Sequence, residues 1–468
     1  MKLRQWQSQC VKSALKHYSS INKHFLCLAT PGAGKTIMAA ELAAQLLEKG
    51  LIDFVLCFSP SIAVSEGIQK TFSWLLNRRF DGVIGAIGSS FTYQSMTYFE
   101  DDFWQILDSN RVLVVFDEIH HCGGTTYENA NRWGQQIILR IQSRARYTLA
   151  LTGTPWRSDQ SPIVLSQYIG EQNNIQCDYV YGLKEAVGEN VCRKPTLVLV
   201  DNEKISVTDE ENSRTVFSSF QQLLSDSLVS YQSIINDTKA IEYILGRGCK
   251  KLAEIRVSNP DAGGLVVASS IEHAVKITRI LKNMNQSAVM VSYKQDQPLE
   301  TINSFRHNDT QWIVSIGMVA EGTDIPRLQV CCHLSRIKTE LYFRQVLGRI
   351  LRVNHSKNQE AWLYTFSEPT LSNYATRIEE ELPDVPVIIR ENANYDLNEQ
   401  EFVRGTCSEA REEYTLSEGL VNPIEISQSM EFGGSSAFNS PENQHQIIDM
   451  LGLFRERVIA TFDSPFSC

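Results

Sequence analysis

Residues 24–36 read HFLCLATPGAGKT, and this stretch decides the fold. A short apolar run is followed at once by a glycine-rich loop, and the loop opens a segment of helix formers that closes with Lys49 and Gly50. Successive backbone N–H groups of such a loop, together with the helix N-terminus, can surround phosphate oxygens. The pattern predicts a phosphate-binding loop between a strand and a helix, with Ala29 at the position where the general pattern has glycine.

Each position of this loop has an expected task. Lys35 is expected to reach the β- and γ-phosphates of a nucleotide, and the Thr36 hydroxyl to ligate Mg²⁺. The other nucleotide-binding positions are Pro31, Gly32, Ala33 and Gly34. The loop therefore indicates ATP and Mg²⁺ as the ligands of the site.

Two carboxylates end another apolar run, VLVVFDE. Asp117 is expected on the metal side, and Glu118 as the general base or water-positioning group of a hydrolysis. Further along, LTGTPWR places the hydroxyls of Thr152 and Thr154 after a strand-like run, where they could hydrogen-bond His120 or Asp117. Such a contact would link the hydrolytic site to a cleft between domains.

The stretch FDEIHHCGG at 116–124 also allows a second interpretation, because His120, His121 and Cys122 are possible zinc ligands. Adjacent residues at the exit of a strand point in different directions, and the sequence holds no second His/Cys cluster with metal spacing. The sequence therefore favours ATP hydrolysis over a zinc hydrolase, and it leaves His121 and Cys122 without a predicted catalytic role.

Short apolar and β-branched runs recur between helical stretches. They are HFLCLAT, DFVLCFS, GVIGAIG, RVLVVFDE, YTLALTG and PTLVLVD in the first half, and GGLVVASS, SAVMVSY, QWIVSIGM, VCCHLS and AWLYTF in the second. Alternation of buried strands with helices indicates parallel α/β sheets. The chain is therefore expected to contain the same α/β architecture twice.

These runs divide the chain into four segments. Residues 1–201 are the first α/β unit, and residues 202–260, which read helical after an acidic entry, are a helical connector. Residues 261–382 are the second α/β unit. Residues 383–468 are an acidic, partly helical C-terminal extension.

The extension accounts for the net charge of −10, because residues 383–468 hold fifteen acidic residues against five arginines and no lysine. The rest of the chain is balanced, so a local basic groove can still follow phosphates. Within the extension, PENQHQIIDMLGLFRERVIATF has a helical period. Its expected apolar face consists of Ile447, Met450, Leu451, Phe454 and Val458. That face would dock on the body or bind a protein partner.

The composition, with 43% hydrophobic and 21% charged residues, is that of a globular protein with several domains. The basic start lacks the apolar region of a secretory signal, and no apolar run approaches the ~18 residues that span a bilayer. Eleven cysteines without a C-x-x-C pair fit a reducing compartment. We expect an intracellular, cytoplasmic protein of a bacterium or phage, with no membrane partner and no zinc.

The stretch YFRQVLGRILRV spaces Gln345, Arg349 and Arg352 so that they would share one face of a helix. Such arginines commonly form a salt-bridge stripe on the surface. In this chain they can instead reach across a cleft to a γ-phosphate, where a guanidinium stabilises the charge of the transition state.

Taken in order, the patterns resemble the superfamily 2 helicases and translocases. They are LRQWQ, ATPGAGKT, FSPS, TYQS, DEIH, LTGTP, VVAS, AEGTD and QVLGRILR, within about residues 1–368. The D-E-x-H and T-G-T-P forms resemble most the branch with the motor subunits of type I and III restriction enzymes and related DNA-repair translocases. The resemblance implies two tandem RecA-like domains with ATP between them.

The resemblance also implies roles for single residues. Gln7 would read adenine, and Gly322 and Asp324 would face the nucleotide or its ribose. A groove for the nucleic-acid backbone would be lined by Pro60, Ser61, Thr92, Gln94, Ser269 and Thr323. Contacts of this kind position a strand without reading its sequence. DNA is favoured over RNA as the track.

Two functions stay open. In the first, ATP closes the cleft and hydrolysis opens it, so that the two domains alternate their grip on a nucleic acid and move along it. In the second, the chain is an ATP-gated switch or motor subunit of a larger defence or repair complex and separates no strands itself, with the acidic extension as a possible protein contact. The extension has no lysine and no D…E-x-K arrangement, so no nuclease activity is expected.

Overall fold

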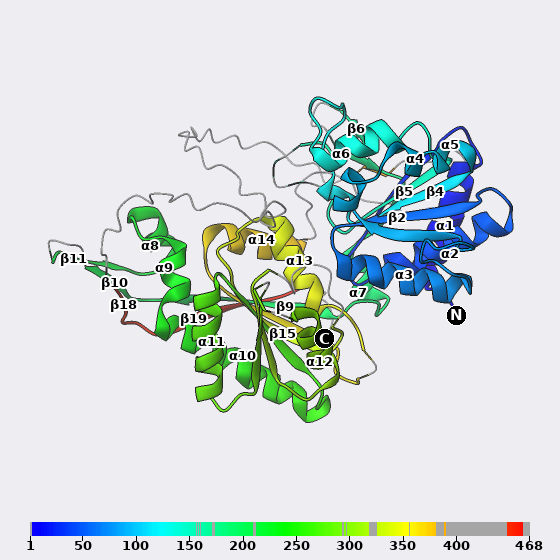
Figure 1. Cartoon of the computed structure of the whole chain (residues 1–468). Helices are drawn as coiled ribbons and strands as arrows, with labels where there is room; N and C mark the ends of the chain where they lie inside the picture. Colours follow the sequence, from blue (N-terminus) through cyan, green and yellow to red (C-terminus); the bar gives the residue numbers. More distant parts are fainter. Residues whose placement is uncertain are drawn as a thin grey trace, which may run out of the picture.

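The computed structural model describes residues 2–155, 157, 159, 161–170, 174–208, 212–292, 294–295, 297–317, 325–354, 356–380, 388–389 and 447–461. They form two lobes, each built around its own parallel sheet (Figure 1). The chain passes from the first lobe to the second between α7 (Leu183–Gly188) and β9 (Lys194–Asn202). In this described part, no helix is long and apolar enough to cross a membrane.

The first lobe contains a six-stranded sheet in which all neighbouring strands are parallel. In spatial order the strands are β3 (Gly88–Thr92), β2 (Phe54–Ser59), β4 (Val112–Phe116), β5 (Tyr147–Thr152), β1 (His24–Ala29) and β8 (Tyr179–Tyr181). Parallel strands bring their carboxyl ends, and the loops that follow them, to one edge of the sheet. The run GVIGAIG is a loop and not a strand, because Gly82 and Gly85 have positive φ, and the strand begins only at Gly88.

Helices cover both faces of this sheet. On one face, α1 (Gln5–Tyr18), α2 (Lys35–Glu48) and α3 (Ile62–Leu76) pack over a shared apolar core. The other face has an aromatic core that includes Phe58 and Trp104. Short elements cover it: η1 (Gln94–Thr97), α4 (Asp101–Trp104), α5 (Ile106–Ser109), η2 (Ile119–His121), α6 (Arg132–Gln136) and the π-helical turn η3 (Ile137–Ile141). A small sheet joins β6 (Gln167–Ile169), β7 (Asn174–Cys177) and β17 (Ile388–Ile389).

The second lobe contains a seven-stranded sheet, parallel except at its last strand. Its order is β13 (Ala288–Val291), β14 (Trp312–Ser315), β12 (Gly263–Ala268), β15 (Leu328–Leu334), β16 (Glu360–Phe366), β9 and β19 (Phe454–Ala460). Its principal helices are α10 (Thr238–Ser258), α11 (Ile271–Asn283), α12 (Pro298–His307), α13 (Glu340–Ile350) and α14 (Pro369–Glu380). α10 packs against β15 and contacts α11, whereas α13 contacts α14. The two lobes thus confirm the expected tandem α/β architecture with parallel sheets.

The structure differs from two expected boundaries. The run PTLVLVD was expected in the first unit, but β9 pairs with β16 in the second sheet. Residues 197–200 are buried on both faces of the strand. Such an apolar run would fit the interior of either parallel sheet, so the sequence of the strand alone does not determine which sheet it joins. The expected helical connector begins with a hairpin of β10 (Ile205–Thr208) and β11 (Arg214–Phe217), and only then forms α8 (Phe220–Asp226), α9 (Tyr231–Asn236) and α10.

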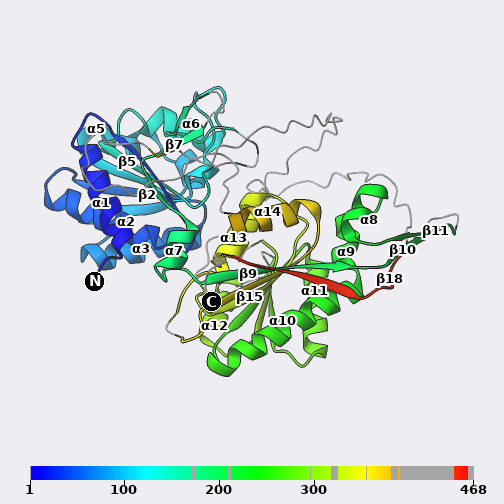
Figure 2. The ribbon, with the colours of Figure 1, turned by 180° about the vertical axis from the view of Figure 1, so that it is seen from behind.

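Residues 447–450 and 454–460 form strands where a helix was expected. β18 (Ile447–Met450) pairs with β10, and β19 pairs antiparallel with β9 (Figure 2). Phe454 of β19 lies opposite Asn202 of β9. The edges of β9 and β10 offer backbone groups that need partners, and this pairing overrides the helical period of the sequence. As a strand the stretch has no helical face: Ile459 is buried while its neighbour Val458 is 54% exposed. Most of the acidic extension lies outside the described residues.

Candidate nucleotide site between the two lobes

The phosphate loop lies between β1 and α2, as expected. Gly32 and Gly34 have φ values of +85° and +95°, in a region that residues with a Cβ rarely adopt. Gly34 is the N-cap of α2, so the loop leads directly into the positive end of the helix. The glycines therefore make a backbone turn at a helix N-terminus, the arrangement in which backbone N–H groups bind phosphate.

Lys35 is almost fully buried and contacts two acceptors. Its Nζ lies 3.1 Å from Glu118 Oε1 and donates to Ala29 O at 3.1 Å. Nζ also lies 3.2 Å from the point where a Cβ on Gly153 would stand. The lysine from the loop after β1 is thus brought against the carboxylate after β4 and the loop after β5.

The two carboxylates after β4 have different environments. The Asp117 N–H donates to Phe58 O and its carbonyl accepts from Tyr93, so the backbone here is fixed from both sides. Burial, and then the neighbouring Glu118, raise the pKa of Asp117. Burial opposes the ionisation of Glu118 too, but Lys35 overcomes it and holds the pKa of Glu118 below its usual value.

Glu118 itself has a left-handed backbone, with φ +51° and ψ +54°. A non-glycine residue in this conformation is uncommon, and such strain is typical of sites where the surrounding structure fixes a side chain. Its Oε2 accepts from the Gly153 N–H at 3.1 Å. Glu118 is therefore held between the phosphate loop and the T-G-T-P loop.

His120 makes the hydrogen bond that the sequence predicted. Its Nδ1 lies 3.0 Å from Thr152 Oγ1 and 3.5 Å from Thr154 Oγ1. Thr152 Oγ1 donates to Thr154 O, so it must accept from His120, which places a proton on Nδ1. Nδ1 also lies 3.4 Å from Glu118 Oε2, while Arg157 donates to His120 O. Burial lowers the pKa of His120 to about 3, so the ring is neutral.

The second lobe meets the phosphate loop through the end of α13. A Cβ added to Gly348 would lie 2.5 Å from Pro31 Cβ, so the helix contacts the loop where only glycine leaves room. One residue further, Arg349 is near enough to Asp117 to lower the pKa of that carboxyl. Arg352 Cγ lies 3.3 Å from the Cβ position of Gly32.

The sequence suggested that Arg352 shares a helix face with Gln345 and Arg349, but in the structure it does not. α13 ends at Ile350, and Gln345 and Arg349 are both on it. Arg352 lies beyond the end and forms an isolated β-bridge with Cys192. The chain leaves the helix there because its backbone pairs with the linker, and this pairing is what brings Arg352 to the phosphate loop.

Gln7 lies against the phosphate loop. Its Nε2 donates to Gly34 O at 2.9 Å, its Oε1 accepts from the Arg4 N–H, and Arg4 donates to Ala33 O. The side-chain amide thus orders the start of α1 on the loop, and the reading of adenine by Gln7 stays a prediction. Gly322, Thr323 and Asp324 lie outside the described residues.

The predicted nucleic-acid contacts of the first lobe come together at one edge. β2 and β3 are paired with Ser59 opposite Thr92, so Pro60 and Ser61 leave one strand beside Thr92 and Gln94. Ser269 lies apart from them, after β12 in the second lobe. Its N–H and its Oγ both contact His273 Nδ1, at 3.2 and 2.8 Å. Because the backbone N–H can only donate, His273 Nδ1 is an acceptor, and the serine hydroxyl directs its proton inward.

Other sequence features proved structural. In the basic stretch RIQSRARY at 140–147, Arg140 pairs with Asp101 and Arg144 with Asp108. Cys122 is fully buried in the aromatic core of the first lobe, and burial raises the pKa of its thiol. Within the described residues, no group of three His, Cys, Asp or Glu side chains is arranged to hold a metal ion.

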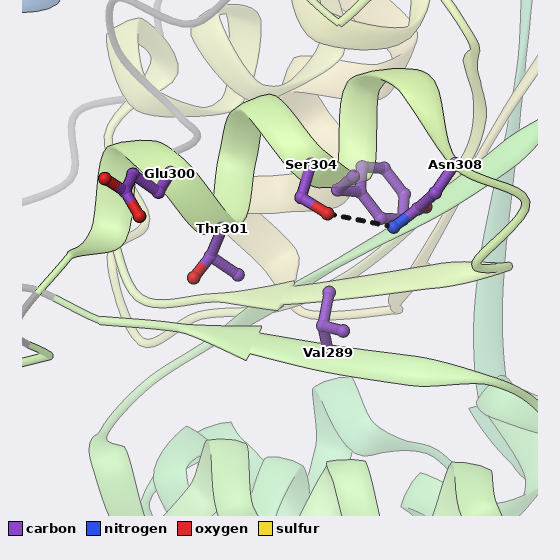
Figure 3. Close-up of a pocket in the computed structure, with 6 residues that line it drawn as sticks. Val289, Glu300, Thr301, Ser304 and Asn308 are labelled. Carbon is purple, nitrogen blue, oxygen red and sulfur yellow. Dashed lines mark hydrogen bonds between the residues drawn. The ribbon is translucent and has the colours of Figure 1, made fainter.

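A separate cavity of about 310 Å³ lies between α12 and β13 of the second lobe (Figure 3). Its lining residues are Val289, Glu300, Thr301, Ser304, Phe305 and Asn308. β13 is at the opposite edge of the sheet from β9 and β19, and none of these residues belongs to the predicted site. The cavity is therefore distinct from the nucleotide site.

Sequence reasoning missed three contributors to the site. The Tyr93 hydroxyl and the Arg157 guanidinium hold the backbone of the D-E-x-H stretch, and both residues belong to quoted patterns, TYQS and LTGTPWR. Cys192 contacts the phosphate loop, with its Sγ 3.5 Å from Pro31 O. No local pattern marks Cys192, because its role depends on the path of the linker between the lobes.

The fold and the site define a class of protein with two α/β lobes. It has a glycine-rich phosphate loop in the first lobe, and α13 of the second lobe, which carries Gly348 and Arg349, lies against that loop. Two known protein families match this chain. Residues 1–157 match the family of the type III restriction enzyme res subunit, and residues 249–354 match the helicase conserved C-terminal domain. These two matches, together with the DNA translocase described below, confirm the resemblance to the superfamily 2 helicases and translocases that is seen in the sequence.

Relatives of known sequence support this assignment. An uncharacterized protein of Mycobacterium leprae is 28% identical over 399 residues, which cover 81% of this chain and 64% of the relative. The chain thus spans slightly less than two thirds of that relative's length. A DNA 3'-5' translocase, XPB2 of Sulfurisphaera tokodaii, is 24% identical over 78% of this chain and 81% of its own. Among solved structures, a fragment of a putative HsdR subunit of a type I restriction enzyme from Vibrio vulnificus has the same fold, with TM-score 0.54, 15% identity and coverage of 82% of this chain and 68% of that chain.

Proposed function

We propose that the chain hydrolyses ATP with Mg²⁺ between its two lobes and uses the cycle to move along a nucleic acid, DNA in preference to RNA. One observation carries the proposal. Lys35 and Glu118 lie 3.1 Å apart in the first lobe, and Gly348 and Arg349 of the second lobe reach the same place. Groups for phosphate binding, for water activation and for charge stabilisation across a cleft are therefore assembled in one site.

The residues present fit a nucleotide with Mg²⁺. Gly32 and Gly34 keep Cβ atoms out of the phosphate cradle, since both have positive φ. Thr36 and Asp117 offer a hydroxyl and a carboxylate, the oxygen ligands that Mg²⁺ prefers. When bound, Mg²⁺ would neutralise charge on the phosphates, and Thr36 and Asp117 are the groups that would hold it.

The chain's own residues then have separate tasks. Lys35 is paired with Glu118 in this structure, so phosphate binding exchanges one negative partner of the lysine for another. This exchange frees Glu118 to orient the attacking water, while the Gly153 N–H still fixes its second oxygen. Arg349 and Arg352 stabilise the developing charge from the other lobe, and their contribution depends on closure of the cleft.

Coupling between hydrolysis and the cleft would pass through His120. Its Nδ1–H contacts both Thr152 and Glu118, so the position of the carboxylate is linked to the T-G-T-P loop. Thr152 and Thr154 are buried, and each hydrogen bond in this small network leaves an unpaired polar group if it breaks. A shift of Glu118 on nucleotide binding is therefore transmitted to the loop.

The nucleic acid would lie along Pro60, Ser61, Thr92 and Gln94 of the first lobe and Ser269 of the second. Contacts there would go to phosphates and sugars and give binding that weakens with salt. A DNA track is supported by the name of a relative, the DNA translocase of Sulfurisphaera tokodaii. Because Ser269 directs both of its donors to His273, we expect it to contribute less to phosphate binding than Ser61.

The test compares ATP turnover with single-stranded DNA, duplex DNA, forked DNA and RNA at a fixed salt concentration. Stimulation by one or more DNA forms, lost in Lys35→Ala, is the expected result. If no nucleic acid changes the rate, the motor function is wrong even where basal ATPase is present.

A second candidate is an ATP-gated motor subunit of a larger complex that separates no strands. Its support is the description of the family that residues 1–157 match, the res subunit of type III restriction enzymes. A strand-displacement assay with a fluorescent duplex distinguishes the two. DNA-stimulated ATPase without strand separation would leave the translocase or switch.

A further inference from the structure

Arg193 is a buried arginine at the junction of the lobes that the proposed mechanism does not use. It lies in the linker between α7 and β9, and its side chain is fully buried. Its Nη1 donates to Leu328 O at 2.6 Å and to Ile350 O at 3.2 Å. Nη2 donates to Pro326 O at 2.9 Å, and Nε to Gln359 Oε1 at 3.2 Å. One guanidinium therefore connects four separate positions of the second lobe.

Packing alone does not account for an arginine at this position. In the described part of the chain, every acceptor of its guanidinium is an uncharged oxygen. Burial lowers the pKa of Arg193 to about 10, so the group is still a cation at neutral pH. Burying a cation without a charged partner costs desolvation free energy, so filling space does not explain why this residue is an arginine. A planar group with donors in fixed directions does explain the residue type.

One of the acceptors, the Ile350 carbonyl, belongs to the helix that carries Arg349 of the predicted site. Ile350 is the last residue of α13, the helix of Gly348 and Arg349, and its carbonyl is among those without a partner inside the helix. A cation at the C-terminus of a helix is also favoured by the helix dipole. In addition, the Arg193 N–H donates to Leu351 O at 2.7 Å. Arg193 thus fixes the end of α13 through both its side chain and its backbone.

The residue before Arg193 contacts the phosphate loop. Cys192 Sγ lies 3.5 Å from Pro31 O, and the backbone of Cys192 is bridged to Arg352. Two consecutive linker residues therefore touch the phosphate loop of one lobe and the end of α13 in the other. The separation of these two elements depends on how firmly Arg193 is held.

We propose that Arg193 is a positioning residue for the arginines that face the nucleotide. By holding the end of α13 and the start of β15, it sets the direction from which Arg349 and Arg352 approach the phosphate loop. This inference rests on the proposed ATP hydrolysis. Arg193 itself touches no reacting group and acts through α13.

The second lobe provides a matched control in Arg327. This arginine is also buried, and its guanidinium donates to Asp261 O, Phe305 O and Thr310 O at 2.6 to 2.8 Å. Burial lowers its pKa to about 10, as for Arg193. These acceptors lie in α12 and just before β12 and β14, and none of them belongs to α13. Because Arg327 lies between Pro326 and Leu328, general damage to that segment would appear in its variant as well.

The experiment compares Arg193→Met with Arg327→Met in the full chain, at a temperature where both are folded. For Arg193→Met we expect kcat to fall roughly 10- to 100-fold, since misplacement by about 1 Å costs about 10²-fold. The affinity for ADP with a fluorescent N-methylanthraniloyl group should not change, because the phosphate loop belongs to the first lobe. Arg327→Met should lower the unfolding midpoint by a similar amount and leave kcat near wild type. Equal loss of kcat in the two variants would overturn the inference.

Arg193→Lys and a double variant complete the test. Arg193→Lys keeps the positive charge but lacks the planar guanidinium with its fixed donor directions, so this variant should have an intermediate kcat. If Arg193→Met does not fold, Arg193→Lys takes its place in the comparison with Arg327→Met. In the Arg349→Ala background, where the residual hydrolysis is followed under single-turnover conditions with the protein in excess over ATP, Arg193→Met should cause less than its full loss, because one of the two arginines through which it acts is absent. Fully additive losses would contradict action through α13. A wild-type chain without ATP turnover would refute the proposed function, whereas an active wild type with unaffected Arg193 variants would refute only this inference.

Discussion

Gly348→Ala provides a direct test of the contact between the lobes. The added Cβ would lie 2.5 Å from Pro31 Cβ and 3.1 Å from Pro31 Cγ. Non-bonded carbon atoms prefer separations of about 3.5–4.0 Å, so α13 and the phosphate loop must move apart by about 1 Å. A misplacement of about 1 Å costs about 10²-fold in rate, which corresponds to about 2.7 kcal/mol of activation free energy.

The stability of Gly348→Ala should change in the opposite direction from its activity. Replacing glycine by alanine inside a helix stabilises it by roughly 0.5–1 kcal/mol. The clash is with the other lobe, so a small opening of the cleft relieves it without unfolding either lobe. We therefore expect a kcat reduced by about 10²-fold, an unchanged affinity for fluorescent ADP, and a thermal midpoint no lower than that of the wild type.

Gly246→Ala is the matched control for this substitution. Gly246 lies in α10 of the same lobe, and a Cβ there would meet no atom within 4 Å. This variant should gain the same helix stabilisation and hydrolyse ATP at the wild-type rate. A wild-type kcat in Gly348→Ala would show that α13 and the phosphate loop do not meet this closely during turnover, and the assignment of the cleft would then be wrong.

Three further predictions follow from the site and the sheet. Lys35→Ala and Glu118→Gln should both abolish ATP turnover in a phosphate-release assay, and only Glu118→Gln should keep ATP binding, because it retains the lysine of the phosphate loop. Arg349→Ala should lose turnover with nucleotide affinity mostly intact; hydrolysis at the normal rate would refute its role across the cleft. Ile459→Ala, which empties a buried position of β19, should lower the free energy of unfolding by about 2–5 kcal/mol in urea titrations. Val458→Ala, on the exposed neighbour, should change it by no more than about 0.5 kcal/mol, and equal effects would contradict the strand pairing.

The phosphate loop and its lysine could be predicted from the sequence because their determinants are local. A strand, a glycine-rich turn and a helix N-terminus follow each other within thirteen residues of 24–36, and each has its own sequence signal. The hydrogen bond between His120 and Thr152 joins distant residues, yet it was predictable as well. Both follow strands of one parallel sheet, and such strands bring their carboxyl ends to the same edge.

The sequence failed where the identity of a pairing partner decides the structure. β9 is equally apolar on both faces, so nothing in its own residues tells which of two parallel sheets contains it. Once β9 lies in the second sheet, its free edge can accept β19, and a stretch with a helical period becomes a strand. The same placement puts Arg193, the residue before β9, in contact with the end of α13. A residue with no local pattern thereby reaches the helix that carries Arg349, and the error in the boundary and the omission of Arg193 have a single cause.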